Sequence, residues 1–283
     1  MSRLNYRLLN VFTCNNAPLS GNPLCVFESG TGLDTETMQA LARQFNLSET
    51  TFILPASSAA ANAQVRIFTP SYELPFAGHP TLGTADVCRS LELGDDELRL
   101  EMKAGIIPVS ASGTRWTLSA NAPGFRELPV ARERLATLLG LARSDIAERP
   151  LWVKSGREQL VVPLASAEAV RSAAPAPQIF QELKSEDGAG MAYVFAEVGI
   201  GQVLARFFFP QGTAVLEDPA TGSATANLGG WWLAMGKPLP CALTASQGTQ
   251  IGRPSTLYLN VDASRQIRVG GDVIEIGRGR LAL

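Results

Sequence analysis

The sequence is poor in the residues on which many metal and thiol sites depend. Its 283 residues include a single histidine and four cysteines. None of the cysteines, which are Cys14, Cys25, Cys88 and Cys241, belongs to a C-x-x-C pair. With one histidine available, a zinc site of the usual Cys/His type is hard to assemble, so no metal is predicted. We expect the cysteines to be reduced and mostly buried.

Excess charge of one sign and long apolar runs are also missing. The formal net charge is −2, without any block of like charges, which argues against nucleic acid as a partner. No apolar run approaches the length of a bilayer, and no apolar signal core follows the N-terminus, so we expect no membrane association and a cytoplasmic location. No glycine-rich nucleotide loop follows a strand, and no cofactor is predicted. The tract Gly199-Ile200-Gly201 lies between two strand-like runs and is expected to be a hairpin turn.

The chain has ample material for a core. Apolar residues make up 46% of the sequence and charged residues 18%, which suits one large domain or two of ordinary size. Strand-like runs predominate, with one principal helix in each half. This pattern predicts an α+β architecture in place of a doubly wound sheet.

The first clear helix is predicted over about residues 35–46. Asp34 is its expected N-cap, and Leu33 with Met38 would form a hydrophobic staple around that cap. The chain then turns into a strand over residues 50–54, and Glu49 stands at the junction. A partly desolvated carboxyl there would be a usable acid/base; the alternative is a solvated turn glutamate, because most glutamates are exposed.

The only histidine lies in the tract Phe76-Ala77-Gly78-His79-Pro80-Thr81, between a strand-like run and a helical pattern that extends to Leu93 with Gly94 as its expected stop. A helix start offers unpaired N–H groups and a positive dipole end, so it suits an anion. Histidine titrates near neutrality and could take part in proton transfer. It could equally be a satisfied histidine at a helix end.

The second half of the sequence repeats the first. Arg66-Ile67-Phe68-Thr69-Pro70 is echoed 140 residues later by Arg206-Phe207-Phe208-Phe209-Pro210, and each run precedes a small-residue tract that opens a helix. The helices are expected to end at Gly94 and Gly236, and residues 119 to about 150 to connect the halves. A pseudo-twofold relation would let the two helix starts face each other across a cleft and hold a carboxylate substrate.

Several co-ordered motifs resemble one family. Gly78-His79-Pro80-Thr81 and Glu217-Asp218-Pro219-Ala220-Thr221-Gly222-Ser223-Ala224 are similar to signature segments of the phenazine-biosynthesis PhzF-like proteins. Other segments agree in the same order along essentially the whole chain: Val11-Phe12-Thr13, Gly21-Asn22-Pro23, Asn46-Leu47-Ser48-Glu49-Thr50, Gln247-Gly248, Gly252-Arg253-Pro254-Ser255 and Val269-Gly270-Gly271.

The resemblance implies a diaminopimelate-epimerase-like fold of two pseudo-symmetric halves, each a curved, mostly antiparallel sheet wrapped around a central helix. The halves would be residues 1–118, joined by the returning segment 272–283, and residues 119–271. The family is typically dimeric, which implies a homodimer, and it works without a cofactor on a small carboxylate-bearing substrate.

The resemblance also implies roles for particular residues. Glu49 would be the proton-shuttling acid/base, with His79 and Asp218 completing the catalytic set. Substrate-binding positions would be Gly78, Thr221, Gly222 and Ser223. Asp218 would orient His79 or pair with a substrate amine, whereas a serine as early in a helix as Ser223 could simply cap it.

The chemistry implied is an isomerase that moves a proton on carbon, with Glu49 as base and helix-end N–H groups stabilising the developing charge. A two-cysteine racemase is disfavoured, because Cys88 lies nine positions beyond His79, about 13 Å along a helix. Two alternatives stay open at this point. One is a non-catalytic small-molecule or partner-binding protein on the same scaffold, and the other is a non-thiol amino-acid epimerase.

Overall fold

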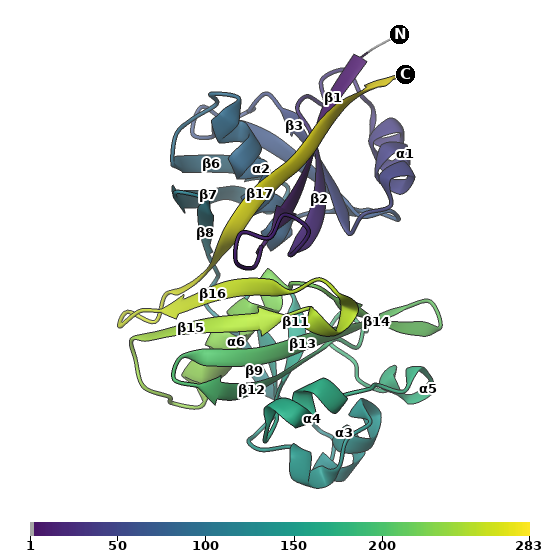
Figure 1. The fold of residues 1–283 in the computed structure, drawn as a ribbon, viewed down its shortest axis with the longest axis vertical. Helices are drawn as coiled ribbons and strands as arrows, with labels where there is room; N and C mark the ends of the chain where they lie inside the picture. Colours follow the sequence, from purple (N-terminus) through teal and green to yellow (C-terminus); the bar gives the residue numbers. More distant parts are fainter. Residues whose placement is uncertain (1–2) are drawn as a thin grey trace. The chain divides into compact units, whose positions relative to one another are not determined.

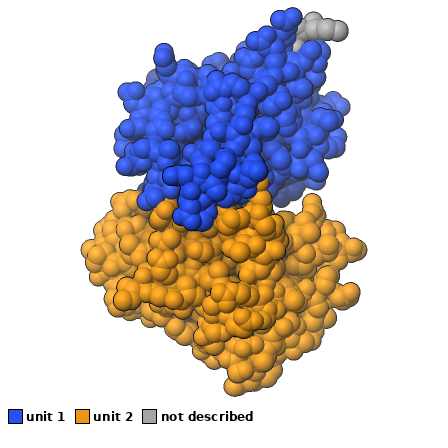
Figure 2. All heavy atoms as spheres, viewed as in Figure 1, with its two compact units in different colours: residues 1–119, 270–283 blue, residues 120–269 orange. Residues whose placement is uncertain are grey.

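The computed structural model describes residues 3–283. The chain forms two compact units (Figure 2). Unit 1 comprises the chain up to Ser119 together with Gly270–Leu283, and unit 2 comprises Ala120–Val269. Within the described residues, no helix is both long enough and apolar enough to cross a lipid bilayer.

Unit 1 is a sheet closed around one helix. Its elements are β1 (Arg3–Val11), β2 (Asn22–Phe27), α1 (Thr35–Phe45), β3 (Glu49–Leu54), β4 (Ala63–Phe68), β5 (Glu73–Leu74), α2 (Gly78–Ser90), β6 (Glu97–Met102), β7 (Gly105–Ser112), β8 (Arg115–Ser119) and most of β17 (Ile267–Ala282). The ladders follow the ring β17–β1–β2–β3–β4–β6–β7–β8 and return to β17. Within this ring, β2–β3 and β4–β6 are parallel. The helix α2 packs against β1, β2, β3, β4, β6 and β8, so it is the core of the ring (Figure 1).

The composition of α2 explains how a helix fits inside so tight a sheet. Nearly all of its residues from His79 to Cys88 are buried, so it has no polar face. At Gly83 an added Cβ would lie 2.5 Å from the side chain of Leu24 and 2.9 Å from that of Val11. Glycine therefore allows the helix to approach β1 and β2 closely.

The helix α1 covers the outer face of the same sheet. Asp34 caps it by accepting a hydrogen bond from the N–H of Thr37, as predicted. Beneath α1, the Phe27 and Phe52 rings stack with centroids 4.8 Å apart. The strand β2 is thus covered on both faces, which is why its sequence is almost continuously apolar.

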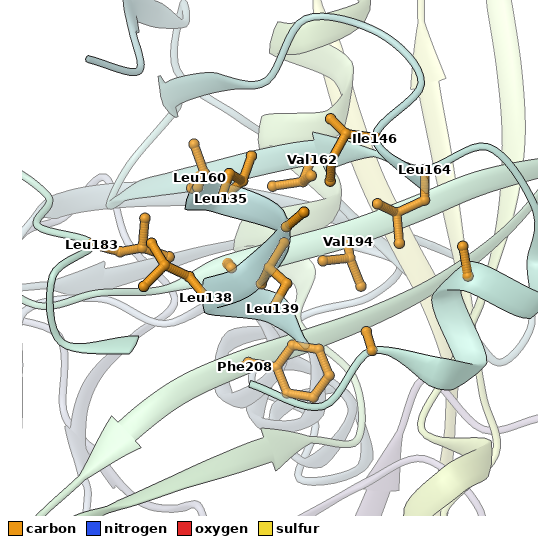
Figure 3. Close-up of a cluster of buried hydrophobic side chains, with 14 of the residues drawn as sticks. Leu135, Leu138, Leu139, Ile146, Leu160, Val162, Leu164, Leu183, Val194 and Phe208 are labelled. Carbon is orange, nitrogen blue, oxygen red and sulfur yellow. The ribbon is translucent and has the colours of Figure 1, made fainter. Parts of the chain in front are cut away.

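Unit 2 repeats this arrangement. Its elements are β9 (Gly124–Glu127), α3 (Arg132–Leu139), the 3-10 turn η1 (Arg143–Asp145), β10 (Leu151–Lys154), β11 (Glu158–Pro163), α4 (Ala167–Ser172), α5 (Pro177–Phe180), β12 (Ala192–Gly199), β13 (Gln202–Gln211), β14 (Ala214–Asp218), α6 (Gly222–Ala234), β15 (Cys241–Gln247), the 3-10 turn η2 (Thr249–Ile251) and β16 (Ser255–Val261). The central helix is α6, which packs against β9, β10, β11 and β16. On the other face, α3 packs Leu135, Leu138 and Leu139 against Val162, Val194 and other apolar side chains of the sheet (Figure 3).

The strand pairings confirm the internal repeat. The order antiparallel β1–β2, parallel β2–β3, antiparallel β3–β4 and parallel β4–β6 recurs as β10–β11, β11–β12, β12–β13 and β13–β15. The central helices α2 and α6 have 13 residues each. The fold is therefore the predicted α+β architecture of two pseudo-symmetric halves, each with a curved sheet around a central helix.

The repeated arginines also occupy matching environments. Arg66 forms an ion pair with Glu73 and lies over the ring of Phe68. Arg206 pairs with Glu217 and lies over the ring of Phe208. Each arginine thus links the long strand that carries it to the short hairpin strand that follows.

Several local expectations need correction. The helix α2 ends at Ser90, with Leu91 as its C-cap, so Gly94 does not terminate it. Gly94 instead lies where a Cβ would clash with Leu98 and Asn62. Residues 119–150 are more than a connection, because β9 pairs with β10 and joins the sheet of unit 2. Gly236, in contrast, follows the end of α6 with a positive φ, as expected of a helix stop.

Candidate functional site

Glu49 and His79 lie side by side in unit 1. Glu49 is the first residue of β3, where it pairs with Leu24 on the parallel strand β2. His79 is the second residue of α2, inside the ring of strands. The Nε2 atom of His79 is 3.4 Å from Oε2 of Glu49, and the side chains are 7% and 17% exposed. The solvated-turn alternative for Glu49 therefore does not hold, because burial and a direct partner both distinguish this carboxyl.

The imidazole of His79 is held in one tautomer. Burial lowers the pKa of His79 to about 3, although a hydrogen bond to the Pro23 main chain opposes the shift. Proline has no N–H, so its carbonyl must accept this bond from a ring N–H. Nε2 has no hydrogen-bond partner of its own among the described residues, which assigns the donor to Nδ1. At neutral pH the ring is uncharged and turns the lone pair of Nε2 toward Glu49.

The first turn of α2 is left open by its sequence. The N-cap Ala77 has no side chain that could accept a hydrogen bond, and Pro80 supplies no N–H. A Cβ added at Gly78 would meet nothing within 4 Å. The main chain at Gly78 therefore borders open space, beside the positive end of the helix dipole.

In unit 2, Asp218 and Thr221 are fixed to each other just before α6. The Thr221 hydroxyl donates to Oδ2 of Asp218 at 2.5 Å. Gln247 donates from Nε2 to the Asp218 carbonyl and to the Thr221 hydroxyl, at 2.8 and 3.0 Å, and accepts from the Thr221 N–H. Thr221 is the N-cap of α6 without capping the helix through its own side chain. Its hydroxyl instead orients the aspartate.

Ser223, the second residue of α6, is bound to a buried amide. Gln159 on β11 donates from Nε2 to the Ser223 hydroxyl at 3.0 Å. Asn227, one turn further along α6, donates to Oε1 of Gln159 at 2.8 Å. Gln159 is 2% exposed and Asn227 0%. These two amides were not recognised as site residues from the sequence, although an asparagine within the otherwise apolar and small-residue run of α6 is the signal that could have found them.

The two units place different chemistry at matching positions. The second residue of the central helix is His79 in α2 and Ser223 in α6. Arg66 lies opposite Phe52 and Arg206 lies opposite Val194 in the strand ladders. Counting back from these pairs, the residue that matches Glu49 is Met191, just before β12. Only unit 1 therefore pairs a carboxyl with a histidine at these positions.

Two of the cysteines are buried, with thiols whose pKa is raised. Burial raises the pKa of Cys88, near the C-terminal end of α2, to about 12. Burial also raises the pKa of the Cys25 thiol on β2. All four cysteines are free, with Cys14 and Cys241 partly exposed. Among residues 3–283, no group of three or more His, Cys, Asp or Glu side chains is arranged to hold a metal ion.

The predicted site residues thus form two local groups. Glu49, His79 and Gly78 meet at the start of α2, and Asp218, Thr221, Gly222 and Ser223 meet at the start of α6. In both groups, residues distant in the sequence support the helix start: a carbonyl of β2 for His79 and an amide of β11 for Ser223.

Comparison with known proteins agrees with this geometry. Residues 9–277 match the family model PhzC-PhzF, described as phenazine biosynthesis-like protein. An uncharacterized isomerase of Pasteurella multocida is 40% identical over 98% of this chain and 93% of its own. The trans-2,3-dihydro-3-hydroxyanthranilate isomerase of Pseudomonas aeruginosa is 32% identical over 98% of this chain and 99% of its own.

Solved structures extend the likeness to the fold. A Bacillus anthracis phenazine biosynthesis protein of the PhzF family superposes with a TM-score of 0.87 at 25% identity, with both chains fully covered. A hydroxyproline epimerase from Agrobacterium vitis has the same kind of fold, with a TM-score of 0.64 at 13% identity over 99% of this chain and 93% of its own. The motifs, the repeated architecture and the full-length matches together show that this chain belongs to the PhzC-PhzF family of phenazine biosynthesis-like proteins, whose relatives include isomerases.

Proposed function

We propose that this protein is a cofactor-independent isomerase that moves a proton on a small carboxylate-bearing metabolite, with Glu49 as the acid/base. The observation that carries the proposal is the buried pair of Glu49 and His79, in which Oε2 and Nε2 face each other at 3.4 Å. Isomerases among the relatives at 32–40% identity support the reaction class.

The neutral imidazole of His79 determines which protonation state of Glu49 it can stabilise. Nδ1 is occupied by the Pro23 carbonyl, so Nε2 can only accept a proton or a hydrogen bond. When Glu49 carries a proton, its carboxyl can donate to Nε2; when Glu49 is ionised, the neutral ring offers it no donor. His79 thus stabilises the protonated form of Glu49 by accepting its hydrogen bond. This is the form that exists after Glu49 has taken a proton from carbon.

The reaction is balanced within the substrate. The Glu49 carboxylate takes a proton from a C–H bond, and the electron pair of that bond moves into the conjugated system that ends in the substrate carboxylate. The same carboxyl returns the proton to a different carbon as the electrons shift back. Main-chain N–H groups at a helix start suit the negative charge that develops in between.

The remaining residues are proposed as binding groups. Gly78 leaves the main chain accessible at the first position of α2. Gly222 holds the first position of α6, and Thr221 and Ser223 offer hydroxyl groups. Asp218, held by Thr221 and Gln247, is proposed to complete the catalytic polar set.

A two-base epimerase is less well supported by the structure. Such an enzyme needs a second base to act on the opposite face of the substrate carbon. At the positions that match Glu49 and His79, unit 2 has Met191 and Ser223, and the Cys88 thiol is buried with a raised pKa.

The decisive experiment uses Glu49→Gln, which keeps the shape of the side chain and removes the base. The substrate to test first is trans-2,3-dihydro-3-hydroxyanthranilate, the compound in the name of the relative at 32% identity. If it is not turned over, a set of small carboxylates is screened for deuterium uptake in deuterated water. We expect the wild type to isomerise or label at least one compound and the variant to lose this activity by at least about 10³-fold.

The matched control is Glu36→Gln, on an exposed position in the first turn of α1. This variant should retain full activity, and both variants should show the same circular dichroism as the wild type. Full activity of Glu49→Gln would disprove the assigned role. Tight binding without turnover of any compound would instead favour a non-catalytic binding protein, and racemisation of a chiral amino acid would favour an epimerase.

A further inference from the structure

A chain of buried amides fixes which partner donates in the hydrogen bond between Gln159 and Ser223. Asn227 Oδ1 accepts from the main-chain N–H of Ser155 at 2.8 Å. Its Nδ2 donates to the Arg157 carbonyl at 3.0 Å and to Oε1 of Gln159 at 2.8 Å. Nε2 of Gln159 then donates to the Ser223 hydroxyl at 3.0 Å.

The ends of this chain remove the ambiguity that usually affects amide side chains. An N–H can only donate and a carbonyl can only accept, so Ser155 and Arg157 together fix which end of the Asn227 amide is the nitrogen. That orientation makes Oε1 of Gln159 the acceptor and Nε2 the donor. Ser223 consequently receives a hydrogen bond through its oxygen, and its own proton remains available.

We propose that Gln159 and Asn227 are positioning residues that make Ser223 a hydrogen-bond donor to the substrate. The group that Ser223 contacts would then be an acceptor, a carboxylate or carbonyl oxygen. An acceptor satisfies the Ser223 proton, whereas an ammonium or amide N–H would use only the second lone pair of the hydroxyl oxygen and leave that proton without a partner. This inference rests on the proposed role of Ser223 in substrate binding and adds which kind of substrate atom it selects.

Burial separates this role from a merely structural one. The bonds from Asn227 to Ser155 and Arg157 hold the turn between β10 and β11, which is a structural task. The bond from Gln159 leads in the other direction, from a side chain that is 2% exposed to the partly exposed Ser223 at the start of α6. A buried glutamine that ends on a helix-start hydroxyl orients that hydroxyl at the point where it meets solvent.

The test reverses the direction of the hydrogen bond between residue 159 and Ser223 while keeping the shape of the side chain at residue 159. In Gln159→Glu, an ionised carboxyl can still accept from Asn227, but it also accepts from Ser223 and so turns the serine proton inward. The probe is 2-aminobenzoate, a stable aromatic carboxylate, with its dissociation constant measured by calorimetry. We expect at least about tenfold weaker binding at neutral pH, the effect of losing one hydrogen bond to a charged group.

The pH dependence of binding distinguishes a reversed hydrogen bond at Ser223 from a general disturbance of the packing around residue 159. Once the new carboxyl is protonated at lower pH, it can again donate to Ser223, so the affinity should recover relative to the wild type measured at the same pH. In the background of Ser223→Ala, Gln159→Glu should have little further effect, because the hydroxyl that it reorients is missing. An equal loss of affinity in both backgrounds, or a loss that does not change with pH, would overturn the proposal.

A second measurement needs neither ligand nor turnover. In the free protein labelled with 15N, the side-chain amide protons of Gln159 should show cross-peaks to the β-protons of Ser223 and slow exchange with solvent. Absence of that contact would refute the assigned polarity. Both readouts are independent of Glu49, so a failure of the proposed proton transfer, tested by Glu49→Gln, remains distinguishable from a failure of this inference.

Discussion

The single histidine makes one prediction unusually clean to measure. His79 is buried inside the ring of unit 1, and burial lowers its pKa to about 3, against an ordinary value of 6.5. We predict that its imidazole stays neutral throughout the pH range in which an exposed histidine titrates. Because the chain has no other histidine, the imidazole signals in an NMR spectrum need no assignment.

The same shift predicts a dependence of stability on pH. The folded pKa lies below the unfolded value, so the unfolded chain binds a proton that the folded chain does not as the pH falls below about 6.5. Stability is therefore fully present above that pH and decreases toward pH 3. With about 1.4 kcal/mol for each pKa unit, acidification from pH 7 to pH 5 should remove about 2 kcal/mol through His79 alone.

The assay compares the wild type with His79→Gln in urea unfolding at pH 7 and pH 5. Glutamine keeps an N–H that can donate to Pro23 but cannot be protonated, and all carboxyl groups are common to both proteins. We expect the variant to be less stable at pH 7, and its free energy of unfolding to fall by about 2 kcal/mol less on acidification.

Two results would refute this reasoning. One is an imidazole that titrates near pH 6.5 in the folded protein, which would mean that Glu49 is ionised and holds a charged His79. The other is an identical pH dependence in the wild type and the variant. The 15N shifts of the ring should also show the proton on Nδ1, and a proton on Nε2 would contradict the hydrogen bond to the Pro23 carbonyl.

Further predictions follow from packing and burial. Gly78→Ala should leave the free energy of unfolding within about 0.5 kcal/mol of the wild type, because a Cβ there meets nothing within 4 Å, yet it should weaken carboxylate binding in calorimetry; unchanged binding would argue against access at this position. Arg206→Ala should destabilise the protein by about 3–5 kcal/mol in urea unfolding, because it strands the buried carboxylate of Glu217 and leaves three main-chain carbonyls without their donor. Arg66→Ala, its counterpart in the more exposed repeat, should cost only about 1–2 kcal/mol, and equal costs would show that burial is not the cause. Iodoacetamide should leave Cys88 unmodified in the native protein, as judged by mass spectrometry of its peptide, because burial raises the pKa of its thiol to about 12; rapid alkylation would contradict the assigned burial.

Local sequence signals predicted the elements whose formation depends on nearby residues. The helix after Asp34 begins where its cap and its apolar spacing place it, and the turn at Gly199-Ile200-Gly201 joins β12 and β13 as expected. The predicted end of α2 was several residues too late, because the helix ends at Leu91 without a glycine or proline to mark the position in the sequence. The repeat was detectable because Arg66 and Arg206 each need the same two partners, an aromatic ring and a carboxylate.

The sequence by itself determined the family, the α+β class and the identity of the polar residues at the two helix starts. The family, the class and these polar residues could be recognised because they depend on contiguous sequence motifs that occur in a fixed order. Only the tertiary structure decided what surrounds them. The burial that keeps His79 neutral comes from strands that close around α2, and its tautomer depends on the carbonyl of Pro23, 56 positions earlier in the sequence (79 − 23). The amides that orient Ser223 likewise come together only when β11 packs against α6. Hydrogen-bond direction and desolvation are properties of the packed neighbours, and packing joins residues that no local sequence pattern connects.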